Sequence, residues 1–254
     1  AEPLFRSASP LLDTSHATNV SAMFAYCSNI TTIPLYDFSN AEWMGGLFQQ
    51  CTSLVSIPNI DTSSATNMAT MFYGCSSLVT VPLFDTSNVT TMYHMFRDCS
   101  SLTSVPQFNT ANVTDMTNMF RNCTSLTSVP ALDLSNNPGV EGMFMGCTAM
   151  EYAPQFDTSH IKSFFQMFKN CTALKAVPLY DTSATASSGS TSVSECFSGC
   201  VNVESGALAW YNQMINQTNP PSYHSSCFTN CGSNTVTGAA ELAQIPTSWG
   251  GTAT

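Results

Sequence analysis

The chain has little charge and very little positive charge. Of its 254 residues only 9% are Asp, Glu, Lys or Arg, and Lys and Arg together number six. Globular domains usually carry about a quarter of charged residues. A formal net charge of −10, without clustered cations to neutralise phosphates, argues against nucleic acid as a partner. Serine, threonine and asparagine must therefore make most of the surface, which suits contacts made by hydrogen bonds.

Long hydrophobic runs are also missing. No stretch of about 18 apolar residues is present, so we expect no membrane-spanning helix and no membrane insertion. No signal peptide is visible at the N-terminus. The start at Ala1 fits either a mature end left by cleavage or an artificial boundary.

The sequence also lacks recognisable catalytic motifs. The four histidines share no short motif with a nucleophile, and no Gly-x-Ser-x-Gly, His-Glu-x-x-His or phosphate-binding loop occurs. Serine, aspartate and cysteine are abundant, but a repeated pattern explains their number. We therefore expect no enzymatic activity, no cofactor and no metal site.

Cysteine recurs at a fixed spacing of 24 residues through most of the chain. The cysteines in this column are Cys27, Cys51, Cys75, Cys99, Cys123, Cys147 and Cys171. Phenylalanine, leucine and proline keep the same period, as at Phe96, Leu102 and Pro106. A constant period of this size predicts a stacked repeat protein, in which one unit cannot bury its apolar face alone.

The unit that begins at Asp85 shows how one coil is expected to fold. Its Asp-Thr-Ser start predicts a turn, because aspartate and serine side chains accept hydrogen bonds from nearby backbone N–H groups. The spacing of Phe96 and Cys99 predicts one short helical or 3-10 turn. Segment 101–108 predicts a short strand cut by Pro106. We therefore expect a β-rich solenoid (α/β) with short strands and one helical turn per coil.

The eleven cysteines are best explained as buried thiols. An odd number leaves at least one unpaired within the chain, and a buried cysteine behaves as a small hydrophobe. Each thiol of the column has two equivalent neighbours, so pairing has no natural choice. Cys196 and Cys227 differ, since both replace methionines in adjacent coils. A disulfide between them is our first candidate, with free thiols, or a zinc site completed by Cys200 and Cys231, as the alternatives.

An aspartate or asparagine opens each unit. These residues are Asp13, Asp37, Asp61, Asp85, Asn109, Asp133, Asp157 and Asp181. A column of carboxylates could hold calcium, but Asn109 keeps the acceptor oxygen and loses the charge. The pattern therefore favours a turn cap over a metal ligand.

The regular spacing breaks near the C-terminus. Cys171 and Cys200 stand 29 residues apart, and Cys200 and Cys231 stand 31 apart. Apolar residues in the second insertion predict an amphipathic helix over roughly 205–217. We interpret this helix as part of a lid for the end of the solenoid, with a contact helix for a partner as the alternative. The expected regions are a lead-in or N-terminal cap over 1–12, a solenoid over 13–204, and an irregular repeat with a cap over 205–254.

Two variable sets of residues are candidates for binding. Between each phenylalanine and cysteine stand Ala25, Gln49, Tyr73, Arg97, Arg121, Met145 and Lys169, a column with half of all cations. Changing identity in a fixed frame indicates exposure. One interpretation is that the charges of this column simply balance neighbouring charges such as that of Asp98. The alternative is a basic and aromatic stripe that binds an acidic glycan or partner, made of Tyr73, Arg97, Arg121 and Lys169. In the second set, Glu151, Tyr152 and Lys175 interrupt the Ser/Thr rows of the strand segment.

The pattern Met-Phe-x-x-Cys-x-x-Leu-x-x-Val-Pro-x-Phe-Asp-Thr-Ser, over residues 13 to about 200, resembles the BspA-like leucine-rich repeats of bacterial surface proteins. More narrowly, it is similar to the Asp-Thr-Ser/Met-Phe variant of mycoplasmas, lactobacilli and gut bacteria. The resemblance implies a leucine-rich-repeat solenoid. It also implies a non-enzymatic, extracellular or cell-surface role in adhesion, in which the protein binds a protein or glycan on a cell surface.

The segment from Cys227 to Gly250 is similar to tails found on such repeats in gut bacteria and their phages. The alternative is therefore a virion component, such as a tail fibre or receptor-binding adhesin, or a self-assembling structural surface protein. Self-association through an uncovered first coil near Leu11 is a further expectation.

Overall fold

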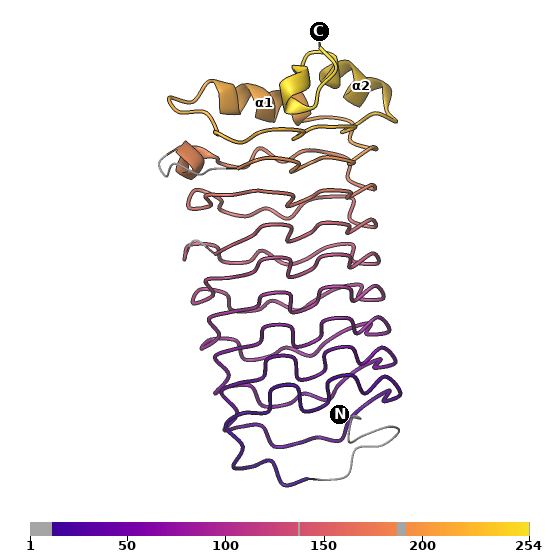
Figure 1. The fold of residues 1–254 in the computed structure, drawn as a ribbon, viewed down its shortest axis with the longest axis vertical. Coiled ribbons are helices and arrows are strands. Elements are labelled where there is room, and N and C mark those ends of the chain that lie inside the picture. The colour runs from indigo at the N-terminus through magenta and orange to yellow at the C-terminus, as the bar shows by residue number, and fades with distance from the viewer. Residues whose placement is uncertain (1–11, 137, 187–191, 254) are drawn as a thin grey trace.

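The computed structural model describes residues 12–136, 138–186 and 192–253. They form an elongated rod of stacked coils, with the first described coil at one end and helices gathered at the other (Figure 1). Residues 1–11 of the expected lead-in, Leu11 among them, lie outside the described residues. No helix in the described ranges combines the length and apolarity needed to cross a bilayer.

A single stack of phenylalanine rings runs through the core. Its members are Phe24, Phe48, Phe72, Phe96, Phe120, Phe144, Phe168, Phe197 and Phe228, all fully buried. From Phe24 to Phe197 neighbouring ring centroids lie 5.3 to 5.7 Å apart, with planes within 18° of each other. Stacked rings at such distances attract each other beyond the effect of burial. The prediction that like residues of successive coils lie over one another is confirmed.

On one face of the rod, backbone hydrogen bonds alternate between neighbouring coils and local turns. In the coil of Phe96, the N–H groups of the even-numbered residues from 92 to 98 donate to carbonyls of the next coil at 2.8 to 3.0 Å. Met95, Arg97 and Cys99 donate instead to the carbonyl three residues back. This alternation satisfies the backbone donors of a segment whose inner side is buried, as buried N–H groups require.

The helical turn expected in each coil is replaced by tight turns. His94 has a φ of 57° and Asp98 a φ of 61°, in the left-handed region that a 3-10 or α-helix does not contain. Both residues send their N–H to the next coil, and bonding between coils thus replaces a local helix. The same two positions have positive φ in the other coils, at Ala22, Tyr26, Gly46, Gln50, Thr70, Gly74, Asn118, Asn122, Gly142, Gly146, Gln166, Asn170, Glu195, Gly199, Ser226 and Asn230.

The short strand expected in each coil is reduced to isolated contacts. Parallel bridges of single residues, such as Thr91 with Asp115 and Ala176 with Ser205, are the only sheet pairing in the described residues. The N–H of Thr103 still donates to Val79 at 3.2 Å. The ladder cannot continue through the proline of each coil, because proline lacks an N–H.

The described helices lie near the C-terminus. They are η1 (Ser183–Ala186), α1 (Ala207–Ile215), α2 (Val236–Leu242) and η2 (Thr247–Trp249). Helix α1 confirms the helix predicted over roughly 205–217. It presents the fully buried Trp210, whose ring meets those of Phe197 and Phe228 edge-on, with centroids 5.3 and 6.1 Å apart.

The last coil is closed by the tail of the chain. After α1 the chain returns to the stack with Phe228, and the Phe228 N–H donates to the carbonyl of Trp249 at 2.9 Å in place of a further coil. The ring of Trp249 stacks on His224 with centroids 4.1 Å apart. Glu241 of α2 accepts hydrogen bonds from the N–H groups of Gly206 and Leu208 at the start of α1. The tail and both α-helices therefore form one cap, as terminal repeats require.

Candidate functional site

The cysteine column belongs to the core. All eleven cysteines are buried free thiols. In seven coils the thiol donates to the phenylalanine carbonyl of the preceding coil at 3.0 to 3.1 Å, as Cys99 does to Phe72. Burial raises the pKa of Cys51 to about 12 and holds the pKa of Cys99 well above its usual value. Such thiols are poor nucleophiles and poor metal ligands.

Cys196 and Cys227 are buried free thiols as well, so the disulfide expected between them is not formed in the structure. The mass of the protein before and after reduction tests the pairing in solution. Within the described ranges, no three His, Cys, Asp or Glu side chains converge as a set of metal ligands.

The aspartate column caps turns. Oδ1 of Asp85 accepts hydrogen bonds from the backbone N–H of Ser87 at 3.0 Å and from its hydroxyl at 2.7 Å. These two bonds stabilise the charged carboxylate and lower the pKa of Asp85. The following Thr86 is buried and donates to the carbonyl of Asn109 in the next coil at 2.8 Å. Both contacts support the turn cap favoured by the sequence.

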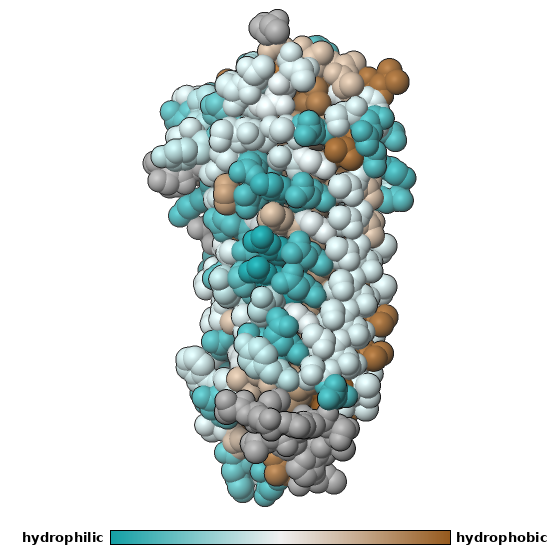
Figure 2. Space-filling view, turned by 45° about the vertical axis from the view of Figure 1, so that its right-hand side comes forward, coloured by the Kyte–Doolittle hydropathy of each residue, from teal (hydrophilic) through white to brown (hydrophobic). Residues whose placement is uncertain are grey.

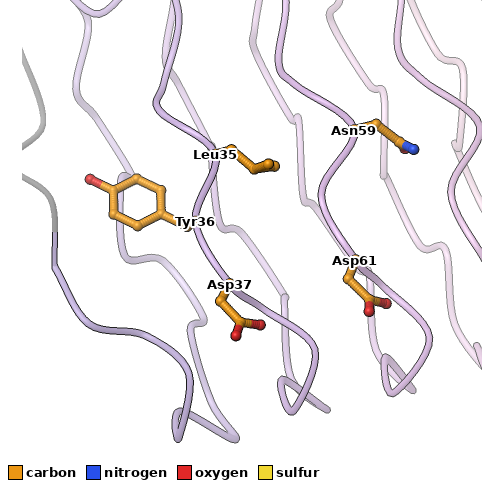
Figure 3. Close-up of a pocket in the computed structure, with 5 residues that line it drawn as sticks. All are labelled: Leu35, Tyr36, Asp37, Asn59 and Asp61. Carbon is orange, nitrogen blue, oxygen red and sulfur yellow. The ribbon is translucent and has the colours of Figure 1, made fainter.

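A hollow beside this column lies near the N-terminal end of the rod. Figure 3 shows Leu35 and Asn59, from neighbouring coils, pointing to the same side, while Asp37 and Asp61 point away from them. Leu35 is 65% exposed. Asp37 already accepts two hydrogen bonds from Ser39, so the turn explains its placement.

The variable column lies on the hydrogen-bonded face of the rod. Tyr73, Arg97 and Arg121 occupy three successive coils, and all three are partly buried. The guanidinium carbon of Arg97 lies 5.4 Å from the ring centroid of Tyr73, a cation–π distance. Its Nε lies 3.4 Å from Oδ2 of Asp98, whose Oδ1 accepts from Nδ2 of Asn122 at 2.7 Å. Figure 2 shows hydrophilic residues gathered half-way along the molecule, beside a smooth band of intermediate hydropathy.

Two further side chains complete this group. His94 stacks on Tyr93 with ring centroids 3.8 Å apart. Burial lowers the pKa of His94, and the nearby Arg97 and Arg121 lower it further, so the imidazole is mainly neutral at pH 7. We call Tyr73, Tyr93, His94, Arg97 and Arg121 the mid-rod cluster.

The structure separates Lys169 from the mid-rod cluster. Met145 occupies the column between Arg121 and Lys169, and the Lys169 ammonium pairs with Glu195 of the next coil. The predicted stripe is therefore interrupted after Arg121.

The second candidate set is brought together. Nζ of Lys175 lies 2.7 Å from Oε2 of Glu151 and 5.8 Å from the ring centroid of Tyr152. The hydrogen bond to the Glu151 carboxylate raises the pKa of Lys175. Tyr152 is 64% exposed, so this trio presents a charged pair and an aromatic ring to solvent.

Sequence reasoning missed Tyr93 and His94 as members of the cluster. Both precede Phe96, in columns occupied by Ala69 and Thr70 one coil earlier. The appearance of two aromatic rings where the preceding coil has small residues was the available signal. It is the same kind of break in the pattern that identified Tyr152.

The coils, the continuous core and the cap define the class of the protein, a capped solenoid with a 24-residue repeat. The chain belongs to the family described as "Mycoplasma protein of unknown function, DUF285", whose model matches residues 4–83, 44–155, 103–210 and 139–234. This assignment fits the resemblance to mycoplasma repeats seen in the sequence. No protein of curated function matches the chain.

Solved structures of bacterial leucine-rich repeat proteins are similar at low identity. A leucine-rich repeat protein of T. pallidum is 16% identical with a TM-score of 0.42, over 75% of this chain and 81% of that one. A leucine-rich cell surface protein of Faecalibacterium prausnitzii is 18% identical with a TM-score of 0.44, over 84% and 66%. One from Bacteroides ovatus is 19% identical with a TM-score of 0.41, over 72% and 50%. Scores this low carry no functional argument.

Proposed function

We propose that this chain is a non-catalytic recognition module outside the cell, on a bacterial surface or on a virion, which binds a protein or glycan through one face of the solenoid. The observation that carries the proposal is the contrast between constant core and variable surface. Phenylalanine and cysteine recur in each coil, while the residue after phenylalanine changes from Tyr73 to Arg97 to Met145. Solenoids build extended binding surfaces from such rows.

The state of the reactive groups supports a non-catalytic role. All eleven thiols are buried, and a thiol such as that of Cys99 also donates a hydrogen bond to the backbone and has a raised pKa. The carboxylates of the turn column, such as Asp85, accept hydrogen bonds from their own turn. Neither set has the accessible, activated nucleophile that covalent catalysis needs.

The mid-rod cluster and the trio of Glu151, Tyr152 and Lys175 are the proposed contact regions. Tyrosine and arginine are enriched in binding interfaces, because each combines a large contact area with polar groups. Both regions hold these residue types, or lysine over a ring, in geometry fixed by neighbouring coils.

A cell and glycan array tests the proposal. We expect the wild-type protein to bind selected surfaces and the Arg97→Ala/Arg121→Ala variant to lose part of that binding. Lys162→Ala removes an exposed cation from a different column and serves as the control. Equal binding by wild type and the double variant would remove the mid-rod cluster from the proposal, and robust turnover in a hydrolase screen would overturn the non-catalytic role.

The sequence that flanks these residues would distinguish a bacterial surface protein from a virion component. A wall anchor or secretion sorting signal beside these residues would favour the bacterium. A trimeric tail or capsid context would favour the virion.

A further inference from the structure

We propose that the mid-rod cluster is a site for an anionic saccharide, whose carboxylate or sulfate group lies against Arg97 and Arg121 while its sugar ring lies against the neighbouring tyrosines. This inference rests on the proposed recognition function and names the ligand class of one of its contact regions.

Among the described residues, the charge of Arg121 has no carboxylate at close range, whereas Arg97 has Asp98 beside it. Nε of Arg97 lies 3.4 Å from the Asp98 carboxylate, whose other oxygen accepts a hydrogen bond from the neutral amide of Asn122. Arg121 has a neutral partner, Oδ1 of Asn118, at 3.4 Å from Nη1, and within the described residues no carboxylate oxygen lies within 4 Å of its nitrogens. The Nε atoms of both arginines are enclosed by protein without a well-formed hydrogen bond, and Nε of Arg97 faces the Asp98 carboxylate. A bound anion would therefore meet the part of each guanidinium group that stays exposed, since 26% of the Arg97 side chain is exposed and Arg121 is only partly buried.

Charged groups from neighbouring coils surround His94. Burial is the main cause of the lowered pKa of His94; Arg97 and Arg121 lower it further, and the carboxylates of Asp115 and Asp98 act in the opposite direction. Two guanidinium groups therefore gather beside His94, although the whole chain carries a net charge of −10. An anion at this place would meet two guanidinium groups from successive coils.

Aromatic rings lie beside the guanidinium groups. Tyr93 is 38% exposed, and its ring is supported by the nearly parallel ring of His94 at 14°. Tyr73 lies under Arg97 in the preceding coil. Aromatic faces of this kind offer a large, rigid apolar area on which the C–H face of a sugar ring can pack. The amide of Asn118 adds planar hydrogen-bonding groups for hydroxyls.

The size of the positive region favours a short saccharide over a long polyanion. The column continues from Arg121 to Met145, and the next cation, Lys169, is paired with Glu195. Two guanidinium groups match one or two anionic groups. A nucleic acid would need a longer cationic track.

The experiment uses the full chain and oligosaccharides of matched length. The probes are oligogalacturonate, which is carboxylated, a heparin-derived oligosaccharide, which is sulfated, and an isomalto-oligosaccharide, which is neutral. We expect calorimetry to show binding of at least one anionic probe, weakened by salt, and no binding of the neutral one. Comparison of the two anionic probes identifies the source of the anion.

Single variants locate the site. Arg97→Gln and Arg121→Gln should each weaken binding by about tenfold, the effect of removing one hydrogen bond to a charged group. Lys162→Gln makes the same change in net charge at an exposed position of another column and should bind like the wild type.

A pH series adds a readout that depends on His94. Its neighbours are Arg97, Arg121, Asp98 and Asp115, with the rings of Tyr73 and Tyr93. Protonation of the imidazole at acidic pH adds a positive charge beside the anion, and the pKa of His94 is lowered from 6.5, so wild-type affinity should rise as the pH falls below 6.5. His94→Asn should remove this rise, because asparagine keeps the left-handed backbone of this position and does not titrate.

The outcomes separate this inference from the proposed function. A protein that binds cells in the array but neither anionic probe would overturn the inference and leave the function standing. Full binding by Arg97→Gln and Arg121→Gln would overturn it too, by placing the ligand elsewhere. A wild-type protein that binds no surface and no probe would contradict both the inference and the proposed function.

Discussion

At the scale of single residues, the thiol of each coil acts as a hydrogen-bond donor inside the core. The Cys99 thiol donates a hydrogen bond to the carbonyl of Phe72, which lies beside the phenylalanine stack. Serine would be a stronger donor but would bury a more polar atom, whereas cysteine also packs as a hydrophobe. This double role explains a cysteine column that forms no disulfides in the structure.

Thiol labelling checks this description. Without denaturant, a thiol reagent such as dithionitrobenzoate should modify none of the cysteines rapidly, because all eleven are buried. After unfolding without reductant, eleven thiols should react. A count of nine, which is eleven minus two, would indicate the bridge between Cys196 and Cys227, and rapid labelling of the native protein would contradict the buried column.

Truncation of a core phenylalanine should lower the free energy of unfolding far more than truncation of a surface leucine. Phe96 is fully buried between Phe72 and Phe120, so Phe96→Ala should lower the free energy of unfolding by about 3–5 kcal/mol. Leu83 is 61% exposed, and Leu83→Ala should change it by no more than about 0.5 kcal/mol. Denaturant titration measures both, and similar losses would refute a continuous core.

At the scale of the element, each coil depends on two left-handed turns. A residue with positive φ turns the backbone so that its N–H reaches the next coil, as at His94 and Asp98. Glycine and asparagine adopt this conformation most easily. The second of the two positions is indeed rich in them, with Gly74, Asn122 and Asn170 in the column.

Substitution at Asn170 tests the turn. Its φ is 60°, where a β-branched side chain costs roughly 1–2 kcal/mol. Asn170→Val should therefore lower the unfolding midpoint clearly, while Asn170→Gly should leave it nearly unchanged. Equal stability of the two variants would show that this position does not need a left-handed backbone.

At the scale of the whole molecule, the rod is a sum of coils that contact their neighbours. Rings such as that of Phe96 stack on the ring before and after, and the thiols of seven coils donate hydrogen bonds to the preceding coil. Stability in such a protein is approximately additive over units and interfaces. The cap formed by α1, α2 and the tail is the exception, because it has no equivalent elsewhere in the described chain.

Deletion of one coil tests this modular character. Removal of residues 37–60 takes out one complete period and joins Tyr36 to Asp61 with each column in register. We expect a folded rod with a moderately lower melting temperature by circular dichroism. Removal of 37–59 leaves one extra residue, shifts the columns of the first coil, and should destabilise that coil more. Equal behaviour of the two deletions would contradict the register.

The period alone determined much of this protein. Residues 24 positions apart share an environment in a solenoid, so the stack of Phe72, Phe96 and Phe120 and the buried cysteine column followed from spacing, and α1 from its own periodicity. The resemblance added the repeat family. These features depend on which residues recur, and recurrence can be read from a sequence.

Tertiary structure decided the rest. Whether His94 and Asp98 continue a helix or adopt a left-handed turn depends on competition for their N–H groups, and the carbonyl that wins belongs to the next coil. The stacking of His94 on Tyr93 and the pairing of Lys169 with Glu195 likewise depend on side-chain directions that turn geometry sets. Period fixes which residues stack, but the path of the backbone between coils fixes which side chains meet.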